Sequence, residues 1–128
     1  MESGADMKIL LIDDDPDILQ HMKKALQILG HTCDFFEDPL AALNQFNGDR
    51  YDLVISDVVM PGMNGFSVAA EIRRIAPATR IILSSGHLTD AMEDTNGDYS
   101  SVIYMKKPMD VHRLKMVLDN MDRQLRAG

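Results

Sequence analysis

Acidic, hydroxyl and basic side chains follow apolar segments at several separate places in the chain. Asp13 and Asp14 come directly after the first such segment, and Asp57, Ser85 and Lys107 come after later ones. Carboxylates that share a site repel one another, and at least one pKa rises unless a cation neutralises them. Mg²⁺ suits such a site, because it prefers oxygen ligands and leaves a position for a phosphate oxygen. A carboxylate nucleophile with Mg²⁺ and a lysine beside it has the groups that phosphoryl transfer requires.

The segments that precede these residues predict β-strands. Short apolar runs that end at turn-forming residues are typical of strands buried on both faces of a parallel sheet. Because helical patterns separate the runs, we expect an α/β fold with helices on both faces of the sheet. Ligands of such sheets bind outside the carboxyl ends of the strands, so the polar residues are expected to converge at one edge. The predicted strands cover residues 8–12, 32–36, 51–56, 80–84 and 101–105.

Cap residues mark where the predicted helices begin. Asp15 and Asp38 each precede a proline, which combines an N-cap with the residue preferred at the first helical position. A third helix is expected over residues 66–75, after a loop rich in turn formers. Asp110 is the expected cap of the last helix. The apolar residues that we expect on the inward face of that helix are Val111, Leu114, Leu118, Met121 and Leu125.

The stretch between residues 86 and 101 fits the alternating pattern poorly. Only residues 89–95 have a helical pattern, their apolar positions are few, and residues 96–98 form an Asn-Gly-Asp turn signal. We therefore expect the fourth helix to be short or irregular.

The length of the chain bounds its organisation. The 128 residues correspond to one domain, which we place at residues 7–125, with a disordered leader over residues 1–6 and a tail over residues 126–128. The longest apolar run is far shorter than the roughly 20 residues that cross a bilayer. No secretory signal opens the chain. These features predict a cytoplasmic location without membrane contact.

The net charge disfavours nucleic-acid binding, and the cysteine content excludes an intramolecular disulfide. Thirteen basic residues against 20 acidic ones give a net charge of −7, so a nucleic acid would be repelled and direct nucleic-acid binding is disfavoured. The single cysteine, Cys33, cannot form an intramolecular disulfide and is expected to be a small buried hydrophobic residue.

Five motifs occur in one order along the chain: Asp13-Asp14, Asp57, Met60-Pro61 with Gly65, Ser85-Gly86 and Lys107-Pro108. In this order and at these spacings they resemble the receiver domain of two-component response regulators, over about residues 7–125. Any one motif alone would be weak, but together they are specific. The resemblance implies a flavodoxin-like, doubly wound fold with five parallel strands in the order 2-1-3-4-5.

The resemblance also implies how phosphorylation would occur. Asp57 is the expected phosphoacceptor, and the donor is a histidine kinase or a histidine phosphotransfer protein. Asp14, Asp57 and the backbone carbonyl of Val59 are the expected Mg²⁺ ligands, and Asp13 would act through a coordinated water. Such a module catalyses its own phosphorylation and dephosphorylation, is not a metabolic enzyme, and passes its signal to a downstream output protein or domain.

Three more residues have roles that the resemblance implies. Ser85 corresponds to the switch hydroxyl and Tyr104 to the switch aromatic, although Tyr104 could instead be a strand aromatic packed against the last helix. Lys107 is expected to contact the phosphoryl group as a point charge and to contribute little to folding. The bond between Lys107 and Pro108 is a candidate cis peptide that would fix the direction of the ammonium group.

Two other functions remain open from the sequence. Flavodoxin-like proteins of the same fold bind phosphate-bearing cofactors, but such a site needs free backbone N–H groups where this chain has three aspartates. A small haloacid-dehalogenase-like phosphatase is the other alternative, because Asp13 and Asp15 match its spaced aspartates. A chain of 128 residues leaves little room for the substrate cap of that class.

Overall fold

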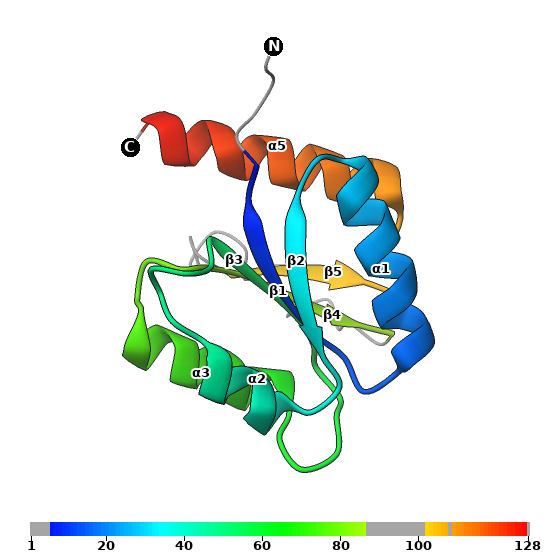
Figure 1. Cartoon of the computed structure of the whole chain (residues 1–128), viewed down its shortest axis with the longest axis vertical. Coiled ribbons are helices and arrows are strands. Elements are labelled where there is room, and N and C mark those ends of the chain that lie inside the picture. Colours follow the sequence, from blue (N-terminus) through cyan, green and yellow to red (C-terminus); the bar gives the residue numbers. More distant parts are fainter. Residues whose placement is uncertain (1–5, 87–101, 108, 128) are drawn as a thin grey trace.

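A five-stranded parallel sheet forms the centre of the molecule (Figure 1). The computed structural model describes residues 6–86, 102–107 and 109–127. The strand order β2-β1-β3-β4-β5 confirms the predicted α/β fold and its predicted order. The strands are β1 (Lys8–Ile12), β2 (Thr32–Phe36), β3 (Leu53–Asp57), β4 (Arg80–Ser85) and β5 (Val102–Lys106).

The four helices of the described residues are α1 (Pro16–Ile28), α2 (Pro39–Gln45), α3 (Gly65–Ile75) and α5 (Val111–Ala127). The side chains of Asp15 and Asp38 cap α1 and α2 by accepting hydrogen bonds from backbone N–H groups two residues ahead, and a proline follows each cap as predicted. The side chain of Asn64 caps α3 by accepting a hydrogen bond from the N–H of Ser67, three residues ahead. These local signals fix where each helix leaves the edge of the sheet.

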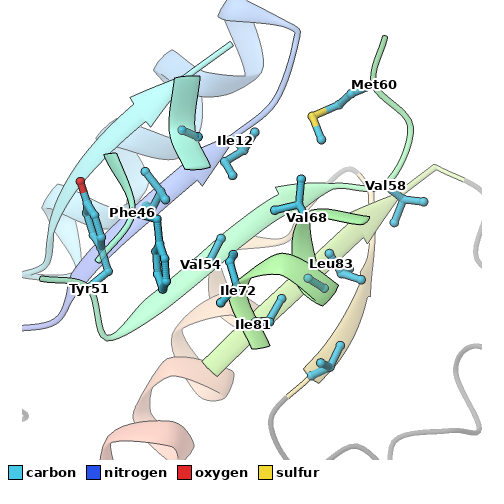
Figure 2. Close-up of a cluster of buried hydrophobic side chains, with 14 residues drawn as sticks. Ile12, Phe46, Tyr51, Val54, Val58, Met60, Val68, Ile72, Ile81 and Leu83 are labelled. Carbon is cyan, nitrogen blue, oxygen red and sulfur yellow. The ribbon is translucent and has the colours of Figure 1, made fainter. Parts of the chain in front are cut away.

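Alternating side chains of the strands form two apolar cores, one on each face of the sheet. Leu10 and Ile12 of β1 pack on the face covered by α2 and α3, where they join Ile72. Figure 2 shows the side chains of this core. Ile9 and Leu11 pack on the opposite face, under α1 and α5. The two-residue period of the strand therefore buries all four side chains.

The inward face of α5 differs from the prediction at its first residue. Leu114, Leu118 and Met121 are buried, but Val111 is 38% exposed, so the buried face starts one turn later than predicted. The side chain of Leu125 lies outside the described residues, as do residues 1–5 of the predicted leader, the expected fourth helix and Pro108. None of the described helices has the length and hydropathy that a membrane crossing requires.

Candidate active site

The carboxyl ends of β1, β3, β4 and β5 meet at one edge of the sheet. Asp13 follows β1, Asp57 ends β3, Ser85 ends β4 and Lys107 follows β5. Backbone hydrogen bonds hold these ends in line, because the N–H of Lys107 donates to the carbonyl of Ser85 at 2.8 Å and the N–H of Val58 donates to β4 at 2.9 Å. The sheet thus brings together residues that are up to 94 positions apart in the sequence.

Three carboxylates form an acidic cluster at this edge. Asp13, Asp14 and Asp57 each offer one oxygen, and these oxygens all lie within 4.8 Å of one another. Asp13 and Asp57 are buried, whereas Asp14 is exposed. Hard oxygen ligands with one solvent-facing side fit Mg²⁺, which usually keeps several water ligands. The three carboxylates match the Mg²⁺ site that the resemblance implies.

Lys107 supplies positive charge to two members of the cluster. Its Nζ lies 2.8 Å from Oδ2 of Asp13 and 3.3 Å from Oδ1 of Asp57. The second oxygen of Asp13, Oδ1, accepts a hydrogen bond from the backbone N–H of Asp15 at 2.9 Å. Asp13 is therefore fixed from both sides, by the entry to α1 and by the lysine that follows β5.

Burial and charge move the pKa values of this pair. Burial raises the pKa of Asp57 above its ordinary value and the neighbouring Asp13 adds to the rise, although Lys107 and a backbone hydrogen bond from Val59 partly oppose it. Burial lowers the pKa of Lys107, but the hydrogen bond and charge of Asp13, with those of Asp57, outweigh burial and raise it. Lys107 is thus a cation at neutral pH, and Asp57 is a more basic carboxylate than an exposed aspartate.

Gly65 fixes the loop that follows Asp57. Its N–H donates to the carbonyl of Val58 at 2.8 Å, which closes the loop at the start of α3. A Cβ atom at Gly65 would lie 2.5 Å from the carbonyl oxygen of Asp57 and 2.9 Å from Cα of Val58. Only glycine permits this approach. The loop in between carries Val59, a residue that is 72% exposed.

Ser84 is a residue that sequence reasoning missed. It pairs in register with Asp57 across β3 and β4, is 4% exposed, and lines the same cavity as Asp57 and Lys107. Ser85, the predicted switch hydroxyl, is also buried and ends β4 one residue later. The register of β3 against β4 distinguishes the two serines, and the sequence does not contain it.

Tyr104 lies apart from the acidic cluster, in the middle of β5. Its ring is partly buried against the core formed with α2 and α3. The ring centroid lies 6.4 Å from that of Phe66, at an interplanar angle of 49°. The alternative prediction, that Tyr104 packs against the last helix, is not confirmed. The core on which Tyr104 packs lies on the face of the sheet opposite α5.

A cavity of about 380 Å³ opens beside the acidic cluster. Ile18 and Met22 of α1 and Met109 contribute apolar walls, and Asp57 and Lys107 lie at its polar end. The cavity therefore connects the carboxylate of Asp57 with the surface of α1.

Comparison with protein families and curated proteins gives matches over most of the chain. The model of the response regulator receiver domain matches residues 9–119. The transcriptional regulatory protein TcrA of Mycobacterium tuberculosis is 32% identical over 110 residues, which cover 84% of this chain and 43% of TcrA. GlrR of Escherichia coli, another transcriptional regulatory protein, is 32% identical over 114 residues, which cover 88% of this chain and 25% of GlrR. The chain thus spans less than half the length of these curated relatives.

Solved structures show the same similarity. A response regulator receiver domain protein from Clostridium thermocellum superposes with a TM-score of 0.83 at 29% identity, covering 94% of this chain and 98% of that chain. The receiver domain of DrrB from Thermotoga maritima, activated with BeF₃, gives a TM-score of 0.78 at 25% identity and covers 91% of this chain and 97% of that chain.

Proposed function

The chain belongs to the response regulator receiver domain family, and we propose that it accepts a phosphoryl group on Asp57 within a two-component signalling system. The family consists of signalling modules rather than metabolic enzymes. One observation carries the assignment of Asp57: its carboxylate lies within 4.8 Å of two other carboxylate oxygens and 3.3 Å from the ammonium of Lys107. An anionic cofactor at this edge would meet the same carboxylates, which disfavours the flavodoxin-like alternative.

The proposed reaction starts from the carboxylate of Asp57. One oxygen attacks the phosphorus of a phosphohistidine, the N–P bond breaks, and the imidazole nitrogen leaves. Burial keeps this carboxylate poorly solvated and basic, which favours its attack. The ammonium of Lys107 can contact the oxygens of the transferred phosphoryl group. The hydroxyl of Ser85 donates a hydrogen bond to a phosphoryl oxygen.

Asp14, Asp57 and the backbone carbonyl of Val59 would hold Mg²⁺, with Asp13 contacting a water ligand of the metal. A bound Mg²⁺ supplies positive charge to the phosphoryl oxygens and lowers the repulsion that opposes transfer. The exposed side chain of Asp14 leaves this side of the cluster open to water and to the incoming donor.

The proposed donor is a histidine kinase or a histidine phosphotransfer protein. The apolar cavity walls between α1 and Met109 lie directly beside Asp57, so a donor helix seated there would present its phosphohistidine to the carboxylate. The curated relatives are longer regulators, which supports the proposal that this domain passes its signal to a downstream output domain or protein.

Phosphorylation with acetyl phosphate and Mg²⁺, followed by intact mass measurement, tests the proposal. We expect one added phosphoryl group on the wild-type chain, none on Asp57→Asn, and unchanged labelling of Asp119→Asn, because Asp119 pairs with Lys115 on the exposed face of α5. Equal labelling of wild type and Asp57→Asn would refute the assignment. Steady turnover of p-nitrophenyl phosphate would instead favour the phosphatase alternative.

A further inference from the structure

Phe66 contacts Tyr104 from the start of α3. The two ring centroids are 6.4 Å apart, within the range of attractive aromatic pairs, and the rings are tilted by 49°. Phe66 is 43% exposed, so its ring covers Tyr104 from the surface without belonging to the buried core. Tyr104 packs on that core with its remaining surface. Its orientation in the unmodified chain therefore depends on a neighbour that can move without disrupting the core.

The backbone on which Phe66 stands is tied to the phosphoacceptor. Gly65, the preceding residue, donates its N–H to Val58 at 2.8 Å and leaves no space for a Cβ against the carbonyl of Asp57. A shift of the loop after Asp57 therefore displaces the first residues of α3. The connection from Asp57 to Tyr104 through Gly65 and Phe66 runs along the start of α3. A connection through Ser85 would instead run along the end of β4.

We infer that Phe66 is a positioning residue that stabilises the orientation of Tyr104 in the unmodified chain, an inference that rests on the proposed function. A contact that is made in one state and weakened in the other shifts the equilibrium towards the first state, by the difference between its free energies in the two states. The resemblance implies that Tyr104 changes its orientation on phosphorylation, and Phe66 would oppose that change. Its removal makes the activated state easier to reach.

The affinity for beryllofluoride in the presence of Mg²⁺ measures this bias, with occupancy read from the ¹⁹F resonance of the bound anion. Aromatic pairs of this kind correspond to a change of about two- to twelvefold in an equilibrium, so Phe66→Ala should tighten binding by that factor. Phe66→Tyr keeps a ring at the exposed position and should restore the wild-type affinity. In a Tyr104→Ala background, Phe66→Ala should have no effect.

A matched control is the second aromatic pair of the same core. Phe46 stacks on Tyr51 with centroids 6.2 Å apart, at the end of the sheet away from the site, so Phe46→Leu should lower thermal stability and leave beryllofluoride affinity unchanged. Wild-type affinity in Phe66→Ala, or the same gain with and without Tyr104, would overturn the inference. Absence of Asp57-dependent binding in the wild type would overturn the proposed function itself.

Discussion

Lys107→Met tests whether one ammonium group balances the two buried carboxylates of the site. Methionine keeps the apolar chain of the lysine but removes the charge that lies 2.8 Å from Asp13 and 3.3 Å from Asp57. Breaking a fully buried ion pair costs about 3–5 kcal/mol, and an exposed pair is worth about 0–1 kcal/mol. Lys107 is 20% exposed and its partners 8% and 10%. We therefore expect a loss of about 2 kcal/mol at pH 7 without Mg²⁺.

The pH dependence of this loss follows from the carboxylates. Without Lys107, the pKa of Asp57 rises further above its unfolded value, because burial and Asp13 are no longer opposed by the lysine. A carboxyl whose pKa is raised by folding binds its proton more tightly in the folded state, so the unfolding free energy falls as pH rises between the two pKa values. The difference between wild type and variant should therefore be small near pH 4 and largest at neutral pH.

Urea unfolding at both pH values, with and without Mg²⁺, measures these differences. The control is Lys115→Met, because Lys115 and Asp119 form a shorter ion pair, at 2.6 Å, with both side chains more than half exposed. Its loss should stay below about 0.5 kcal/mol at either pH. Mg²⁺ should recover part of the loss in Lys107→Met. Equal losses in the two variants, or a loss independent of pH, would refute the electrostatic reasoning.

Three further changes have defined outcomes. Mg²⁺ at about ten times its Kd should stabilise the wild type by about 1.4 kcal/mol, and thermal melting should show no such gain in Asp14→Asn. Gly65→Ala should cost about 1–3 kcal/mol in urea unfolding through backbone overlap, whereas Gly86→Ala, with no neighbouring atom within 4 Å of its Cβ, should cost far less. Burial and the hydrogen bond to Asp34 raise the pKa of Tyr51 to about 12. The neutral hydroxyl of Tyr51 therefore stabilises the fold fully below about pH 10, and this contribution is lost as the pH rises towards the pKa of the folded state. Phenolate absorbance of wild type and Tyr51→Phe, which loses that late titration step, checks this.

The sequence predicts the order of elements because the signals for it are local. An apolar run or an aspartate before a proline needs no distant residue for its interpretation. The start of β3 shows where local signals fail: the strand begins at Leu53 and not at residue 51. The carboxylate of Asp52 accepts the N–H of Lys8 at 2.9 Å, and the hydroxyl of Tyr51 donates to Asp34 at 2.6 Å. These long-range contacts hold residues 51 and 52 outside the ladder, so the strand starts two residues later than predicted.

The site was predictable in its composition and not in its pairing. The rule for parallel sheets brings Asp13, Asp57 and Lys107 to one edge, but it does not say that the lysine contacts both carboxylates. As a point charge for a phosphoryl group, Lys107 would contribute little to folding. Because it is the partner of two buried carboxylates, we expect it to contribute to stability as well. Ser84 and the contact of Phe66 with Tyr104 depend on register and helix placement, which a single sequence does not encode locally.

Phosphorylation of Asp57 would change which negative group the ammonium of Lys107 balances. In the unmodified chain its ammonium is closer to Asp13 than to Asp57. A phosphoryl group on Asp57 would replace one negative charge by about two at neutral pH and extend them away from the strand end. The stronger attraction then lies on the phosphoryl side, so the lysine is expected to shift from Asp13 towards the new oxygens. Asp13 keeps its hydrogen bond from the N–H of Asp15, so the acidic frame stays in place while the cation moves.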